Sequence, residues 1–144
     1  MTLALGVSLW YGEADSGIFL LSTIITLLAG VIGLMVGRRA ESRMGEREGY
    51  VIVAMVWVVF SAFGLLPYYL SGQVNSITDA WFESMSGFTT TGATIIPDLD
   101  VITHGLLFWR SLTQWIGGMG IIVLSIAILP IFGLNGMQLY AAEV

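Results

Sequence analysis

Three long apolar runs dominate the chain, and short polar segments separate them. Residues 17–37 are all apolar residues, Ser, Thr or Gly, and residues 50–70 carry no charge. Residues 104–130 are apolar apart from a polar interruption that begins at Arg110. Because about 20 helical residues cross a hydrocarbon core of about 30 Å, the pattern predicts membrane-spanning helices over 17–37, 50–70 and 104–130.

The chain begins with a shorter apolar run, Met1–Trp10. Such a run reaches only about half of the spanning length, and it lacks the basic segment and cleavage site of a signal peptide. Two interpretations stay open: the tail end of a helix whose beginning is missing, which we favour, or a short interfacial helix. A polar break over residues 12–15, with Glu13 and Asp15, separates this run from the first predicted span.

Most of the arginines lie in one short loop, residues 38–49, which predicts the orientation of the chain. The positive-inside rule places this loop in the cytoplasm and the N-terminus outside. Acidic residues alternate with the arginines, so a nucleic-acid-binding patch is not expected. The charged residues of the loop are Arg38, Arg39, Arg43 and Arg47 with Glu41, Glu46 and Glu48. In the preceding span, Gly30, Gly33 and Gly37 have the spacing that allows another helix to approach closely.

A helix too short to cross the bilayer is predicted over residues 77–88. Ser76 and Asp79 fit a capping-box start, and about ten helical residues rise only about 15 Å, half of a bilayer core. The next residues oppose a helix, because β-branched threonines and a glycine lower helix propensity. A half-length helix that runs into a non-helical segment, residues 89–94, predicts a re-entrant pore helix and loop.

The irregular segment has the composition of an ion-selectivity filter. At membrane depth an irregular backbone persists only where it is buried in protein or lines a watery cavity. Potassium filters use rings of backbone carbonyls, with glycine for unusual dihedrals, and the C-terminal end of the short helix presents partial negative charge to a cation. We therefore interpret residues 90–94 as one filter strand; its residues are Thr90, Thr91, Gly92, Ala93 and Thr94.

Composition supports a membrane protein and excludes several kinds of site. The chain is 56% hydrophobic and 10% charged, with a mean hydropathy of +0.87, whereas soluble domains are about 25% charged. The absence of Cys excludes disulfides and thiolate metal sites within these residues, and the single His104, expected at the interface, excludes a multi-histidine site. No nucleophile–base pair is evident, so an enzyme is the least favoured class.

Arg110 is the charged residue predicted to lie inside the last span. A charge at that depth is costly and is usually paired or functional, and Glu83 and Asp79 on the short helix are the available partners. We favour a buried pair that braces the short helix against the last one, because a cation on a cation path repels its substrate. Beyond it, the glycines of residues 117–120 predict close packing or bending.

Two stretches resemble the Trk/Ktr/HKT potassium transporter superfamily. Residues 79–94 look like its first pore loop, and residues 110–121 with residues 136–140 are similar to the helix that follows that loop. Within the superfamily the resemblance is to the TrkH/TrkG-type bacterial potassium uptake subunit. It implies that Thr90, Thr91, Gly92 and Ala93 offer carbonyl oxygens to K⁺, with Gly92 as the filter glycine.

The resemblance also implies partners. Family members have four helix–loop–helix repeats around one pore, form homodimers in the bacterial inner membrane, and bind a cytosolic nucleotide-binding regulatory subunit. The sequence departs from that pattern by holding one repeat, and a filter needs a full ring. The other strands are therefore expected from the remaining repeats or from identical subunits, with the filter facing outside.

The expected fold class is an all-α integral membrane protein: a transmembrane helix followed by a helix–pore loop–helix repeat of potassium-channel type. Residues 1–48 hold the remnant of an N-terminal hairpin and the cytoplasmic loop, and residues 49–144 hold the repeat and a cytoplasmic tail. The predicted function is potassium transport, with K⁺ as the transported ion. The alternatives are a complete small subunit of a homotetrameric two-helix channel, or a non-conducting structural membrane subunit.

Overall fold

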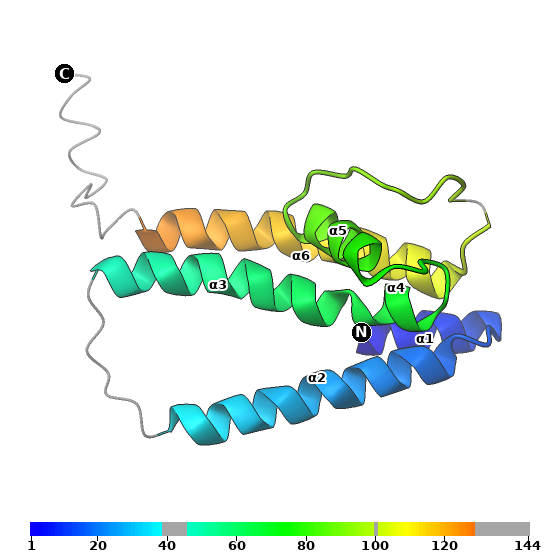
Figure 1. The fold of residues 1–144 in the computed structure, drawn as a ribbon, viewed down its shortest axis with the longest axis horizontal. Coiled ribbons are helices and arrows are strands. Elements are labelled where there is room, and N and C mark those ends of the chain that lie inside the picture. Colours follow the sequence, from blue (N-terminus) through cyan, green and yellow to red (C-terminus); the bar gives the residue numbers. More distant parts are fainter. Residues whose placement is uncertain (39–45, 100, 129–144) are drawn as a thin grey trace.

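The computed structural model describes residues 1–38, 46–99 and 101–128, and the regular secondary structure within these ranges is helical. The helices are α1 (Thr2–Tyr11), α2 (Ser16–Gly37), α3 (Glu46–Gly64), α4 (Leu66–Leu70), α5 (Ile77–Phe88) and α6 (His104–Ile128). The short α5 contacts both α3 and α6, while α1 packs against α6 and α2 (Figure 1). The expectation of an all-helical chain holds for the described residues.

The apolar run over 17–37 forms α2, which begins one residue earlier at Ser16. Among the described residues, α2 is the one helix that is both long and apolar enough to cross a membrane. It contacts α1 and α4 near its start, and Figure 1 shows it running away from the other helices toward its C-terminal end. The Met1–Trp10 run is also helical, as α1, and Gly12 ends it with a φ of 68°.

The second predicted span differs from the prediction at its start and near its end. The helix begins at Glu46 instead of residue 50, because Glu and Arg are good helix formers and extend it into the charged segment. It also ends at Gly64, and the separate short α4 follows from Leu66. Pro67 explains this break, since it has no N–H to donate to the carbonyl of Phe63 and its ring crowds that carbonyl.

The helix predicted over 77–88 is present as α5 with those bounds. The expected capping box is wrong, however: Ser76 is the N-cap, with φ −111° and ψ 135°, but its side chain makes no capping hydrogen bond. The last predicted helix begins at His104 as expected. Its predicted end at residue 130, the following tail and residues 136–140 lie outside the described residues.

Phe88, at the end of α5, lies between aromatic rings of α3 and α6. Phe88 is buried and packs edge-on against the buried Trp109 of α6. A Cβ at Gly117 would overlap the backbone carbonyl of Phe88, and one at Gly120 would lie 3.1 Å from the ring of Trp57. Close packing is therefore the role of these two glycines.

The glycines of α2 behave differently. Nothing lies within 4 Å of a Cβ built at Gly30, Gly33 or Gly37. That these residues allow a close helix stays a prediction, because α2 diverges from the other described helices toward its C-terminal end (Figure 1).

Candidate pore loop

The loop after α5 folds back on the end of that helix through its backbone amides. The N–H groups of residues 89–92 donate to carbonyls of the last turn of α5, which a helix leaves without partners of its own. The donor–acceptor pairs are Thr89 N with Met85 O at 2.9 Å, Thr90 N with Gly87 O at 3.0 Å, Thr91 N with Ser86 O at 3.0 Å, and Gly92 N with Ser86 O at 3.4 Å. These bonds use the amides of the loop and leave its carbonyls for other partners.

Two loop residues have a positive φ. The value is 59° at Thr90 and 74° at Gly92, with Thr91 between them. Glycine adopts this conformation freely, whereas a β-branched threonine there is an outlier that costs free energy. Such strain persists where the surroundings over-determine it and concentrates at functional sites. The backbone of the predicted filter is thus non-helical and locally strained.

A buried ion pair lies behind the loop. The Arg110 Nη1 atom of α6 donates to the Glu83 Oε2 atom of α5 at 2.5 Å, and the Glu83 side chain is 0% exposed. The other carboxylate oxygen, Oε1, accepts bonds from the Thr94 hydroxyl at 2.5 Å and from the Ile95 amide at 2.7 Å. Because both oxygens have donors, the carboxylate meets the requirement for a buried charge. It joins α5, α6 and the end of the loop.

Two carbonyls of the predicted filter, residues 90–94, also have side-chain donors. The Arg110 Nη2 atom donates to the Gly92 carbonyl at 3.0 Å, and the Ser86 hydroxyl donates to the Ala93 carbonyl at 2.6 Å. Arg110 therefore contacts the predicted filter as well as Glu83. The interpretation of Arg110 as a brace between α5 and α6 agrees with this geometry. Through the Gly92 carbonyl, Arg110 also holds the loop.

The structure separates the predicted site residues by exposure. Residues 90–94 are exposed, whereas Glu83 and Ser86 behind them are buried. Asp79 is exposed in the first turn of α5, and the partner of Arg110 is Glu83. The alternative pairing of Arg110 with Asp79 is therefore wrong. The carboxylate that pairs is the one a turn farther along the helix, where α5 meets α6.

A second polar cluster, absent from the predicted site, fixes the start of α6. The Glu13 carboxylate, in the turn between α1 and α2, accepts bonds from the backbone amides of His104 at 2.7 Å and Gly105 at 3.0 Å. It also bonds the His104 ring at 2.8 Å, and that ring stacks on Tyr11 with centroids 4.2 Å apart. The carboxylate thus caps a helix from 91 residues away in the sequence.

Burial by itself raises the pKa of the Glu13 carboxyl, but the hydrogen bonds from Gly105 and His104 outweigh it and hold the pKa below the ordinary value of 4.5. The neighbouring Asp15 accepts a bond from the Thr103 hydroxyl at 2.6 Å. In the sequence, Glu13 and Asp15 are recognisable only as a polar break between two apolar runs. Their pairing with residues 103–105 has no local signal, because a cap is recognised only where its residues are close in sequence.

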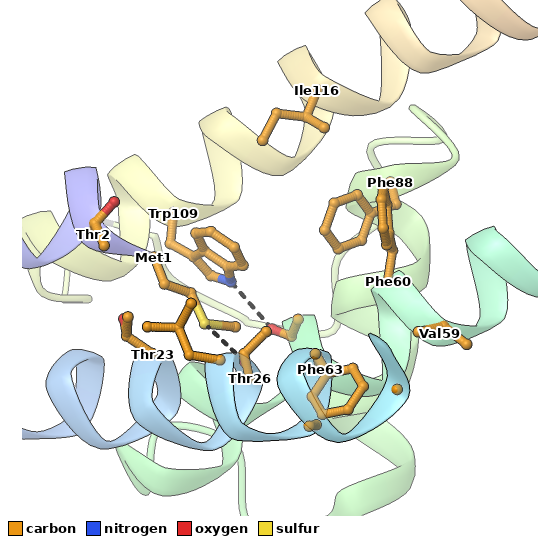
Figure 2. Close-up of a pocket in the computed structure, with 15 residues that line it drawn as sticks. Met1, Thr2, Thr23, Thr26, Val59, Phe60, Phe63, Phe88, Trp109 and Ile116 are labelled. Atoms are coloured by element: carbon orange, nitrogen blue, oxygen red, sulfur yellow. Dashed lines mark hydrogen bonds between the residues drawn. The ribbon is translucent and has the colours of Figure 1, made fainter. Parts of the chain in front are cut away.

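An apolar cavity of about 610 Å³ lies between α2, α3 and α6. Figure 2 shows the rings of Phe60, Phe63, Phe88 and Trp109 around it. Two polar groups here bond to carbonyls of the protein: the Trp109 indole donates to the Gly64 carbonyl at 3.1 Å, and the Thr26 hydroxyl donates to the Ser22 carbonyl at 2.8 Å. The lining of the cavity is therefore mostly apolar, in contrast to the hydrogen-bonded loop after α5.

Comparison with known proteins adds to this geometry. A family model described as "TrkH: Cation transport protein" matches residues 7–144. The chain belongs to the TrkH family. The resemblance of residues 79–94 and 110–121 is thereby confirmed, and the family is one of transporters rather than enzymes.

Named relatives in the TrkH family cover almost the whole chain. It is 47% identical over 138 residues to the Trk system potassium uptake protein TrkH of Salmonella typhimurium, covering 95% of this chain and 29% of that protein. It is 35% identical over 138 residues to TrkG of Escherichia coli, covering 95% of this chain and 28% of the relative. TrkI of Halomonas elongata is 38% identical over 143 residues, with 99% of this chain and 29% of the relative covered. The chain thus spans less than a third of these relatives.

Proposed function

We propose that this chain contributes to potassium transport of the Trk type, and that residues 90–94 form one strand of the selectivity filter. The relatives in the TrkH family are named potassium uptake proteins. The observation that carries the proposal is the loop after α5, which is exposed on one side while its amides are turned into the helix behind it. K⁺ is the transported ion in this proposal, held by carbonyl oxygens in place of its hydration shell.

The proposed strand uses the residues expected from the sequence: Thr90, Thr91, Gly92, Ala93 and Thr94, with Thr90, Thr91 and Gly92 nearest to K⁺. Each carbonyl oxygen has two lone pairs, so an oxygen that accepts one hydrogen bond keeps capacity for a further ligand. Positive φ values at Thr90 and Gly92, two residues apart, support an unusual carbonyl arrangement along the strand. Glu83 and Arg110 support the strand from behind, whereas Asp79 lies apart at the exposed end of α5.

The proposed architecture is a helix–pore loop–helix repeat in which α3 with α4 forms the first helix, α5 the pore helix and α6 the second helix. A ring of four strands is needed, so the other strands come from the remaining repeats of a longer protein or from identical subunits. By the same resemblance, the working protein is a homodimer in the bacterial inner membrane with a cytosolic nucleotide-binding regulatory subunit. Residues 38–49 lie in the cytoplasm, and the filter faces outside.

The test compares two glycines that share a backbone conformation but differ in position. Gly92 has a φ of 74° and Gly72 a φ of 69°, and a Cβ has no contact closer than 3.9 Å at either site. Gly92→Ser and Gly72→Ser thus carry similar strain in similarly open space. Both are made in the full-length gene and expressed in a strain without potassium uptake, where growth at low K⁺ and the K⁺/Na⁺ uptake ratio are measured at matched protein levels.

We expect Gly92→Ser to abolish growth at low K⁺ or to lower the K⁺/Na⁺ ratio at least tenfold, while Gly72→Ser stays close to the parent. A serine hydroxyl at the filter changes the ligands and the width of the ion path, whereas one in the turn between α4 and α5 does not. If the two variants behave alike, residues 90–94 do not form the ion path, and the proposal is overturned.

A further inference from the structure

Two buried serines on α5 differ in what they contact. The Ser86 hydroxyl donates to the Ala93 carbonyl at 2.6 Å, whereas the Ser84 hydroxyl has no hydrogen-bond partner within the described residues. Both serines lie in the last two turns of α5, with Ser84 0% exposed and Ser86 6% exposed. Substitutions at these two serines therefore distinguish the effect of losing a buried hydroxyl from the effect of losing a hydrogen bond to the loop.

The Ser86 bond holds one of two successive peptide groups that are fixed from different helices. Ser86 of α5 binds the Ala93 carbonyl, and Arg110 of α6 binds the carbonyl of the preceding Gly92. The backbone carbonyl of Ser86 also accepts the amides of Thr91 and Gly92, at 3.0 and 3.4 Å. One residue thus holds the loop on both sides of Gly92, with its carbonyl before and its hydroxyl after.

We infer that Ser86 is a positioning residue for ion selectivity, and this inference rests on the proposed filter. Its hydroxyl fixes the Ala93 peptide group against α5 and so limits how far the strand moves toward the ion path. Selectivity for K⁺ over the smaller Na⁺ depends on the positions and the field of the filter oxygens. A strand that lost this bond would close more readily around Na⁺. Ser86 therefore acts through Ala93 and touches no ion itself.

Loss of the bond has little effect on folding, because Ala93 is exposed and water replaces the missing donor. The expected signature of Ser86→Ala is therefore changed selectivity with near-parental stability. A residue that served folding alone would give the reverse result, with a lower melting temperature and unchanged ion preference.

The experiment uses the full-length protein purified into liposomes. Ser86→Ala and the matched control Ser84→Ala are compared with the parent for K⁺ and Na⁺ flux and for thermal unfolding in detergent. Ser86→Cys is the second variant, because it keeps nearly the same volume but donates only a weak hydrogen bond. We expect the K⁺/Na⁺ ratio to fall about fivefold in Ser86→Ala, the factor that corresponds to one hydrogen bond of about 1 kcal/mol. The ratio should fall less in Ser86→Cys and stay unchanged in Ser84→Ala.

If Ser86→Ala and Ser86→Cys both keep the parental K⁺/Na⁺ ratio while Gly92→Ser changes it, the role of Ser86 is overturned. The proposed filter is then still supported. An equal fall in Ser84→Ala also overturns it, because the bond to Ala93 is then not the cause. If Ser86→Ala does not accumulate, Ser86→Cys alone decides between a lowered and a parental ratio. If Gly92→Ser also keeps the parental K⁺/Na⁺ ratio, both the proposed filter and the role of Ser86 are overturned.

Discussion

The glycines beside the loop and the glycines of α2 have opposite surroundings. Gly117 lies against the Phe88 backbone so closely that a Cβ would overlap it, whereas a Cβ at Gly33 meets nothing within 4 Å. Both are helical glycines in apolar stretches with further glycines three or four residues away. The difference shows that a small-residue spacing permits close approach, while the neighbouring elements decide whether it occurs. Here α5 and its loop approach α6 directly, whereas Gly30 and Gly33 of α2 line the cavity that separates α2 from α3.

Polar contacts follow the same division. Glu83, Arg110 and Ser86 join α5, α6 and the loop through hydrogen bonds. In the hairpin of α1 and α2, the described polar contacts to α6 lie in the turn with Glu13 and Asp15. Polar contacts therefore join the loop to both α5 and α6, whereas those of the hairpin are confined to one end, although α1 also packs against α6.

The largest effect should come from the buried carboxylate. Glu83→Ala leaves the Arg110 guanidinium without its partner, and loss of one member of a buried ion pair costs about 3–5 kcal/mol. Asp79→Ala, on the exposed first turn of the same helix, should stay within about 0.5 kcal/mol. Thermal unfolding of the full-length protein in detergent measures both. Equal shifts in the melting temperature would mean that the loop region is no more tightly held than the surface of α5.

A smaller effect is expected from the glycines themselves. Gly117→Ala forces its methyl group against the Phe88 carbonyl, and overpacking of this kind costs about 1–3 kcal/mol. Gly33→Ala adds a methyl group in open space, where alanine favours a helix over glycine by about 0.5–1 kcal/mol. The same unfolding measurement should therefore give shifts of opposite sign. A loss of stability in Gly33→Ala would show that a helix of the full-length protein covers this face of α2.

The smallest effect is expected at Glu13, in the turn between α1 and α2, and it depends on pH. The folded-state pKa of Glu13 lies below its ordinary value of 4.5, so the carboxylate stabilises the folded protein above pH 4.5. That stability is lost as the pH falls through the lowered pKa. Hydrogen exchange at the Gly105 amide should therefore speed up below pH 4.5, relative to a reference amide inside α6. Glu13→Gln should remove this pH dependence, and a dependence that persists would assign it to another group.

The sequence alone predicted most elements of the fold, because hydrophobic runs and helix propensities act locally. The helix bounds of α2 and α5, the start of α6 and the non-helical residues 89–94 follow from such local patterns. Arg110 is recognisable in the sequence as a charge in an apolar run, whereas the choice between Glu83 and Asp79 as its partner depends on the packing of α5 against α6. The predicted span over 50–70 has a break at Leu65, which follows from the effect of Pro67 on the Phe63 carbonyl.

The remaining contacts had no signal in the sequence. Ser86 and Ser84 have the same residue type, helix and burial, and only the path of the loop gives one of them a partner. Glu13 lies in a polar turn, and its role as a cap depends on the position of α6. These are tertiary contacts, for which one sequence without its fold offers no periodicity or local motif.

The cap on α6 has a consequence for biosynthesis. Glu13 is synthesised 91 residues before the amides it binds, and at about 5–20 residues per second this interval is roughly 5–18 seconds. During that time the hairpin exists without its attachment to α6. The attachment of this hairpin to α6 is therefore late, after the segment that carries the loop has been translated.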